Sequence, residues 1–92
     1  MQITLNYLAQ VRRAAGVETE RIAAGDAADI RSVLVEAAGR HGPEFRALIL
    51  DESGHIRPSV MVLVNGVPAD REKPHVLSGG DTVSILTAMA GG

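Results

Sequence analysis

The fold of this chain is decided by the stretch SVMVLVNG at residues 59–66. Its first six residues form a short continuous apolar run, which is typical of a strand buried within a sheet. Asn65 and Gly66 follow, and this pair favours the positive-φ turn of a β-hairpin. The stretch therefore predicts a buried strand over residues 59–64 that enters a tight turn.

Strands are also predicted on both sides of this stretch. Residues 1–7 (MQITLNY) and 82–86 (TVSIL) alternate apolar and polar side chains, which indicates strands with one buried face. Residues 17–22 mix β-branched and charged side chains, and we expect a second strand there without a clear inward face. Because proline cannot donate to a ladder, any strand between Pro68 and Pro74 is limited to a sheet edge.

One main helix is predicted over residues 27–41, where apolar residues recur at i, i+3, i+4, i+7 and i+8. Asp26 is expected to cap its first turn, with Asp29 three residues on. Capping and the helix dipole explain these two carboxylates better than a catalytic pair does. The helix should end at Gly42, which is followed by a proline.

The remaining segments carry weaker patterns. Residues 8–16 are expected to form a loop, and residues 43–50 one short helical turn that brings Phe45 and Leu48 to the core. Residues 51–54 (DESG) have the composition of a tight turn. The order of elements predicts an α+β fold of the β-grasp (ubiquitin-like) type, with a mixed sheet of four to five strands covered by one main helix.

Composition excludes several classes of function. With 92 residues, the chain is long enough for one compact domain. Net charge is −2 without runs of like charge, so we expect no nucleic-acid partner. The absence of cysteine excludes disulfides, thiolate catalysis and iron–sulfur ligation. Neither a leader segment nor a membrane span is evident, and a cytoplasmic protein without a membrane partner is expected.

Three segments together resemble a known family. They are VMVLVNG at residues 60–66, LSGGDTVSIL at residues 77–86 and AMAGG at residues 88–92. These segments resemble the C-terminal half of the MoaD/ThiS family of ubiquitin-like sulfur carriers, which includes the small subunit of molybdopterin synthase. One departure is Thr87, where many relatives have proline.

The resemblance implies a carrier, not an enzyme. It implies that an ATP-dependent E1-like adenylyltransferase adenylates the Gly92 carboxylate, and that a sulfur donor, a sulfurtransferase, then displaces AMP to leave a thiocarboxylate. An acceptor enzyme would receive the sulfur, and the carrier itself would bind no cofactor. Gly91 and Ala90 would thread the chain end into the partner.

This scheme is chemically reasonable for the residues present. An ionised carboxylate is a poor acyl donor and must be activated, and glycine places no Cβ beside the reacting carbonyl. We therefore expect a globular domain over residues 1–87 and a flexible tail over residues 88–92, disordered in the free protein.

Four residues are candidate partner contacts. Leu86 and Met89 flank the tail and could form a small apolar docking patch, or could equally be buried under the sheet. Arg12 and Arg13 lie in the expected loop, where they are either simply solvated or dock a partner.

Other motifs favour ordinary structure. His41, His55 and His75 lack metal-site spacing, so we expect solvated loop histidines and no metal. The GGD at residues 79–81 precedes a strand and is expected to be a turn instead of a phosphate loop.

Two other functions remain compatible with the sequence. The same activated glycine could join lysines of other proteins, as in a ubiquitin-like modifier, or the chain could be an inert β-grasp interaction domain. The pathway that would receive sulfur is also open between molybdopterin, thiamine, cysteine and tRNA thiolation. Residues 50–58 and 88–92 resemble the longer carriers linked to cysteine synthesis or protein modification.

Overall fold

The computed structural model describes residues 1–70, 73 and 75–87. In this part of the chain the elements follow in the order β1 (Gln2–Tyr7), α1 (Ala9–Ala15), β2 (Thr19–Ala23), α2 (Ile30–His41), α3 (Pro43–Ile49), β3 (Val60–Val64), β4 (Val67–Pro68) and β5 (Thr82–Thr87). The sheet has the strand order β2-β1-β5-β3-β4. β1 and β5 are parallel and the other pairs antiparallel. The fold is therefore α+β, a ubiquitin-like β-grasp with a mixed sheet, as predicted.

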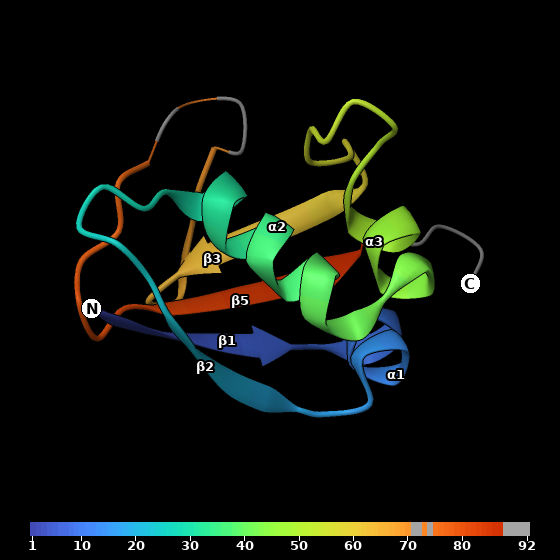
Figure 1. Cartoon of the computed structure of the whole chain (residues 1–92), viewed down its shortest axis with the longest axis horizontal. Coiled ribbons are helices and arrows are strands. Elements are labelled where there is room, and N and C mark those ends of the chain that lie inside the picture. Colours follow the sequence, from blue (N-terminus) through green and yellow to red (C-terminus); the bar gives the residue numbers. More distant parts are fainter. Residues whose placement is uncertain (71–72, 74, 88–92) are drawn as a thin grey trace.

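The core lies between the sheet and the helices. Every second residue of β1, β3 and β5 is buried, and α2 and α3 lie over that inner face of the sheet (Figure 1). Helix α2 buries one stripe of side chains against the sheet: Ile30, Val33, Leu34, Ala37 and Ala38. The chain's two aromatic residues, Tyr7 and Phe45, pack edge to face with ring centroids 5.4 Å apart.

The hairpin prediction is confirmed. Asn65 has φ 52° and Gly66 φ 82°, the left-handed pair that a two-residue hairpin turn requires. The turn joins β3 to the two-residue strand β4, in which Pro68 pairs with Leu63 at the edge of the sheet. β5 extends one residue beyond the predicted end, to Thr87.

The prediction of a loop over residues 8–16 is wrong, because Ala9–Ala15 form helix α1. Val11 is fully buried and fixes this short helix against the domain, while alanines fill half of its other positions. The helix ends at Gly16, whose φ of 78° allows its N–H to donate to the carbonyl of Arg12 at 2.9 Å. The structure thus has helices α1 and α3 in addition to α2, whereas one main helix over the sheet was predicted.

The predicted start of the main helix is also wrong. α2 begins at Ile30, and its N-cap is Asp29 instead of Asp26. The Asp29 carboxylate accepts from the Ser32 N–H at 2.8 Å, and the Asp29 N–H donates to the Ser32 hydroxyl at 3.0 Å. This reciprocal capping box satisfies two backbone donors at once, which a cap at Asp26 would not do.

Helix α3 is longer than the single turn expected at residues 43–50. Phe45 is buried as predicted and Leu48 is partly buried, while Ile49 and Leu50 add to the core. Residues 51–54 form a turn in which the Gly54 N–H donates to the Asp51 carbonyl at 3.0 Å.

Candidate functional site

The candidate site begins where the described chain approaches its end, at Thr87 of β5. Thr87 pairs with Val60 of β3, and its side chain is almost fully buried. Its hydroxyl donates to the side-chain carbonyl of Gln10 at 3.3 Å, which joins the end of β5 to α1. Gly92, Gly91, Ala90 and Met89 lie outside the described residues, so their predicted roles stay predictions.

Leu86 lies on the face of the sheet that the helices leave open. It is the cross-strand partner of Met61, so both side chains point to the same side of the sheet. Leu63 and its partner Pro68 continue this face toward the edge. We call Met61, Leu63, Pro68 and Leu86 the outer strip.

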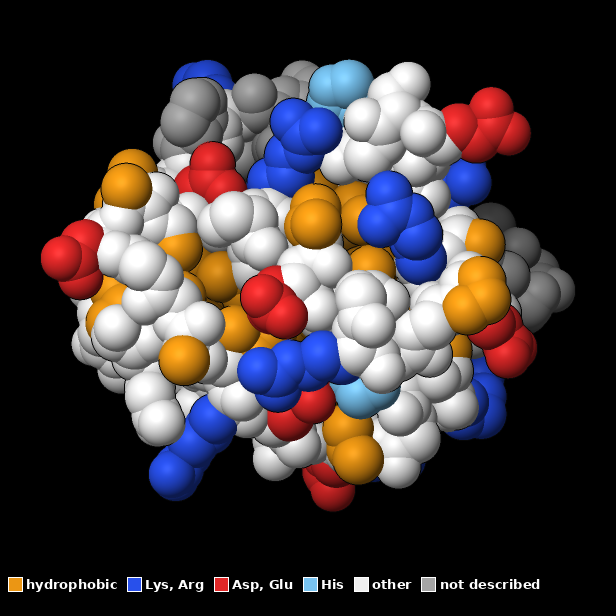
Figure 2. Space-filling view, in the orientation of Figure 1, with side chains coloured by type: hydrophobic (Ala, Val, Ile, Leu, Met, Phe, Trp, Pro, Cys, Tyr) orange, Lys and Arg blue, Asp and Glu red, His pale blue; other side chains and the backbone are white. Residues whose placement is uncertain are grey.

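The outer strip is accessible. Met61 is 47% exposed, and Leu63 and Leu86 are partly exposed. On the helix-bearing face, acidic and basic side chains stand side by side among the apolar groups (Figure 2). Of the two arrangements considered for Leu86, the structure has the partly exposed one. Adjacent exposed apolar side chains are characteristic of protein-docking surfaces.

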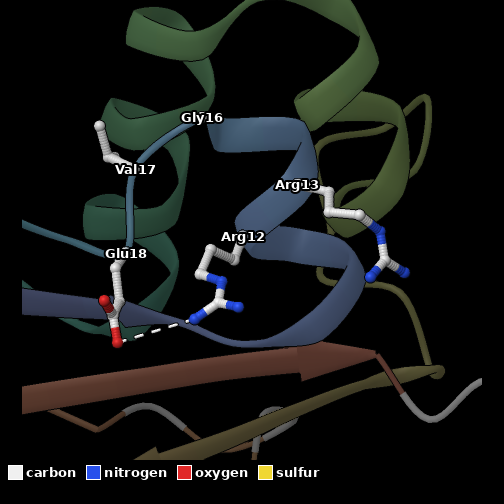
Figure 3. A pocket seen from close by; sticks show the side chains of 5 residues that line it. All are labelled: Arg12, Arg13, Gly16, Val17 and Glu18. Atoms are coloured by element: carbon white, nitrogen blue, oxygen red, sulfur yellow. Dashed lines mark ion pairs between the residues drawn. The ribbon is translucent and has the colours of Figure 1, made fainter.

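Arg12 and Arg13 extend from α1, the helix that contacts the end of β5. With Gly16, Val17 and Glu18 they line a shallow hollow of about 280 Å³. Arg12 lies 3.7 Å from the Glu18 carboxylate, whereas Arg13 points away from it (Figure 3). Because both members of this ion pair are exposed, the pair contributes little to stability. Neither arginine belongs to the outer strip.

A polar cluster occupies the opposite end of β5. The Asn65 side chain donates to the Asp81 carboxylate at 2.9 Å and accepts from the Thr82 N–H at 2.9 Å. The second carboxylate oxygen of Asp81 accepts from the Ser78 N–H at 2.8 Å. The segment at residues 79–81 is therefore a turn, as predicted, and it is tied to the β3–β4 hairpin.

These bonds change the acidity of Asp81. The backbone donor at Ser78 and the amide of Asn65 stabilise the carboxylate, so they hold the pKa of Asp81 below its ordinary 3.8. The cluster binds its own turn instead of facing a cavity. Its residues therefore shape the sheet and offer no reactive group.

A second polar network is partly buried on the inner face of the sheet. The Glu20 carboxylate of β2 accepts a hydrogen bond from the Tyr7 hydroxyl and lies 2.6 Å from Nε2 of His41. Arg40 is 4.0 Å from the other oxygen of this carboxylate. Burial, and then the hydrogen bond to Glu20, raise the pKa of Tyr7 above its ordinary 10.0.

The expectation of solvated loop histidines is thus wrong for His41. Its side chain is only 13% exposed at the end of α2, and its ring packs against Tyr7 and Phe45. His55 does lie in an exposed loop, with Nδ1 3.9 Å from Asp51. Within residues 1–70, 73 and 75–87, no group of three or more potential ligands is placed to hold a metal. In the same residues, none of the helices is both long and apolar enough for a membrane span.

The fold and the open apolar strip beside the end of β5 define a ubiquitin-like β-grasp protein. The model of the ThiS family matches residues 5–92, and the chain belongs to this family. Comparison with curated proteins gave no match.

Solved structures share this fold. SAMP1 from Haloferax volcanii is similar with a TM-score of 0.88 and 22% identity over 100% of both chains. A putative molybdopterin converting factor subunit 1 from Pyrococcus furiosus has a TM-score of 0.73 and 26% identity, covering 97% of this chain and 99% of that one. A chain of the Amycolatopsis orientalis BexX/CysO complex has a TM-score of 0.68 and 25% identity, covering 98% and 99%.

Sequence reasoning missed three members of the outer strip, Met61, Leu63 and Pro68. The period of two within residues 59–64 could have separated Met61 and Leu63 from the inward valines. Their contact with Leu86 depends on the strand register, for which the sequence carries no local signal.

Proposed function

We propose that this chain is a sulfur carrier whose reactive group is the carboxylate of Gly92. The chain supplies an acyl group and a docking surface, and its partner enzymes supply the catalysis. The observation that supports this most strongly is that the family match extends through Gly92, so both final glycines lie inside the matched region. The open outer strip next to the end of β5 supports it independently.

The chemistry takes two steps, the first at the α-phosphate of ATP and the second at the carbonyl carbon of Gly92. A Gly92 carboxylate oxygen attacks the α-phosphate of ATP in an E1-like adenylyltransferase, which forms the acyl-adenylate and releases pyrophosphate. A hydrosulfide equivalent from the sulfur donor then attacks the carbonyl carbon. A C–S bond forms, the C–O bond to AMP breaks, and the thiocarboxylate carries sulfur to the acceptor enzyme. Neither step oxidises or reduces the carrier.

The outer strip is where the activating enzyme docks. Leu86 is six residues from Gly92, so a partner covering Leu86 and Met61 holds the start of the tail. A five-residue tail then reaches at most about 17 Å beyond Thr87. Arg12 and Arg13 offer a second, charged contact on the neighbouring helix α1.

A protein modifier is the second candidate. A similar structure from Haloferax volcanii, 20% identical, is described as a small archaeal modifier protein. A modifier needs the same adenylation but transfers the Gly92 acyl group to a lysine amine. The sulfur pathway stays open between molybdopterin, cysteine, thiamine and tRNA thiolation, because the putative molybdopterin converting factor and the chain of the BexX/CysO complex are nearly equal in identity to this chain.

The test is sulfur loading in host extract with ATP and a sulfide source, followed by intact mass. The unchanged chain should gain the mass of one oxygen-to-sulfur exchange, and a chain with one residue added after Gly92 should not. Gly92→Ala should also lose sulfur loading, because its Cβ crowds the reacting carbonyl. Gly25→Ala is the matched control and should load normally, because a Cβ at Gly25 meets no atom within 4 Å. Equal sulfur loading of the extended chain would refute the proposal. Lysine-linked conjugates without sulfur loading would favour the modifier.

A further inference from the structure

Helix α1 is a cationic element in a chain whose net charge is −2. Its residues include Arg12 and Arg13 and no acidic side chain. On α2, by contrast, Arg40 is matched by two carboxylates, because it lies 4.0 Å from Glu20 and 3.9 Å from Glu36. Positive charge is therefore less neutralised on α1 than around Arg40.

The two guanidinium groups of α1 retain unused donors. Arg12 lies 3.7 Å from the Glu18 carboxylate, and the two side chains are 53% and 71% exposed. Water screens such a pair, so a competing carboxylate displaces it with little loss of stability. Arg13 points away from Glu18 (Figure 3) and, within the part of the chain that the structure describes, makes neither an ion pair nor a hydrogen bond. Both cations are thus available to an incoming ligand.

The surface around these cations fits a peptide better than a small molecule. The hollow that they line with Gly16, Val17 and Glu18 is shallow and measures about 280 Å³. This is below the roughly 300–1,000 Å³ of pockets that enclose small molecules. Val17 adds an apolar side chain that is 41% exposed, and a Cβ at Gly16 would meet no atom within 4 Å. The hollow therefore offers two cations, one apolar contact and open space above the chain.

Carboxylates are the anions that best match this arrangement. A guanidinium holds a carboxylate through two parallel N–H donors. A nucleic-acid site needs a basic stripe, whereas here Glu18 stands within the hollow and the chain as a whole is acidic. A protein segment that combines carboxylates with an apolar side chain matches every component of the hollow.

The hollow is separate from the outer strip. Helix α1 packs against α3 and the end of β5, and the 3.3 Å hydrogen bond between Gln10 and Thr87 joins it to the last residue of that strand. The outer strip lies on the face of the sheet that the helices leave open, and none of its residues lines the hollow. A partner on α1 and a partner on the outer strip therefore use different surfaces near the same strand end.

We propose that the hollow on α1 is a second docking site whose occupant is an acidic segment of a partner protein. One carboxylate pairs with Arg13, another replaces Glu18 at Arg12, and an apolar side chain between them covers Val17. Opposite charges at such a surface speed encounter and fix orientation more than they raise affinity. The inference deepens the proposed function, on which its role in the cell rests, but binding of the segment needs no activated Gly92.

The first test titrates the intact, isotope-labelled chain with the end-blocked peptide EELEE at low salt, followed by nuclear magnetic resonance. The Nε–Hε resonances of Arg12 and Arg13 and the amide resonance of Val17 should shift. Raising the salt concentration to about 0.2 M should weaken binding about fivefold or more, because exposed charges are screened. The neutral peptide QQLQQ should cause no shift, and equal shifts with both peptides would overturn the proposal.

Variants of the hollow sharpen this test. The double variant Arg12→Gln with Arg13→Gln should lose EELEE binding, whereas Glu18→Gln should tighten it, because no internal carboxylate then competes for Arg12. Arg21→Gln is the matched control, since it removes the same charge from an exposed arginine outside the hollow, and it should bind like the unchanged chain. Undiminished binding by the double variant, or an equal loss in Arg21→Gln, would contradict the site. Tighter binding of oligothymidylate than of EELEE would also contradict it.

The second test separates this proposal from the proposed function. In host extract with ATP and a sulfide source, the double variant should load sulfur at Gly92 about threefold more slowly, or worse, than Arg21→Gln does. Added salt should slow the unchanged chain more than the double variant. Full-rate loading of the double variant would remove α1 from the partner contact and leave the carrier standing. EELEE binding by a chain that never loads sulfur would refute the carrier and support the hollow as a site for acidic segments.

Discussion

The two ends of β5 are held by different kinds of contact. At its start, the exposed side chains of Asn65 and Asp81 tie two turns together through several short hydrogen bonds. At its end, Thr87 makes one side-chain hydrogen bond, and the neighbouring surface is apolar. The start of β5 is thus held by polar groups of two turns, whereas partly exposed apolar side chains of the outer strip lie beside its end.

This difference divides the residues that resemble the family into a structural part and a part near the proposed reactive group. The Asn65–Gly66 pair and the turn at residues 79–81, which carry much of the resemblance, contact each other and shape the sheet. The proposed reactive group lies beyond the other end of the strand. Substitutions at the first end should therefore change stability, and substitutions at the second should change partner reactions.

The largest effect is expected from placing a charge on the outer strip. Met61→Asp should slow adenylation of Gly92 by about tenfold or more. The partner must then cover a carboxylate in place of an apolar side chain, and removing that carboxylate from water costs free energy. The thermal midpoint should change little, since Met61 is half exposed.

Val35→Asp is the matched control, because Val35 is 40% exposed on α2, away from the outer strip. Equal losses of adenylation in Met61→Asp and Val35→Asp, measured as pyrophosphate release with the activating enzyme, would remove the outer strip from the docking surface.

The next effect concerns the polar end. Asn65→Ala should lower the free energy of unfolding by about 1–2 kcal/mol, because two side-chain hydrogen bonds are lost and the left-handed backbone disfavours alanine. Adenylation of the folded variant should match that of the unchanged chain. Urea unfolding measures the first quantity, and a stability equal to that of the unchanged chain would contradict the structural role of the cluster.

The two ends should also respond to opposite extremes of pH. The lowered pKa of Asp81 means that its stabilisation is present above the unfolded value near 3.8 and is lost as pH falls through the lower folded value. The pKa of Tyr7, beneath the tail end, is raised above 10.0. Its stabilisation is present below the unfolded value and is lost as pH rises beyond it.

Tyr7 is the chain's single tyrosine, so ultraviolet titration of tyrosinate reports on this group alone. Ionisation is expected only together with unfolding, and Tyr7→Phe should remove this part of the alkaline loss of stability. Ionisation of Tyr7 near pH 10 in the folded chain would show that its hydroxyl is not held by Glu20.

The smallest effect is expected at Thr87. Thr87→Val keeps the volume of this buried side chain but loses the hydrogen bond to Gln10, which should cost roughly 0.5–1.5 kcal/mol. Gln10→Ala in the Thr87→Val background should then add little. A double-mutant cycle measures this coupling, and fully additive losses would show that the contact contributes nothing to holding the strand end.

The sequence predicted the sheet well because strands β1, β3 and β5 bury alternate or continuous apolar residues. It predicted α1 as a loop because a seven-residue helix with Val11 as its one fully buried side chain has too short an apolar pattern. The start of α2 was misplaced since Asp26 and Asp29 are both good caps. Only the reciprocal hydrogen bonds between Asp29 and Ser32, which form the capping box, distinguish the two.

The partly buried Glu20 network was not predictable for a related reason. Glu20 and Ile22 share the inward face of β2, but one apolar and one charged residue in a short strand define no face. Its partners Tyr7 and His41 are 13 and 21 residues away in sequence, so only the tertiary fold brings them together.

The carrier chemistry is tested most directly by the intact mass of the protein purified from its own host. We expect a fraction whose mass has increased by one oxygen-to-sulfur exchange, with alkylation mapping the sulfur to Gly92. An unmodified mass that persists after incubation with ATP, host extract and a sulfur donor would contradict the sulfur carrier.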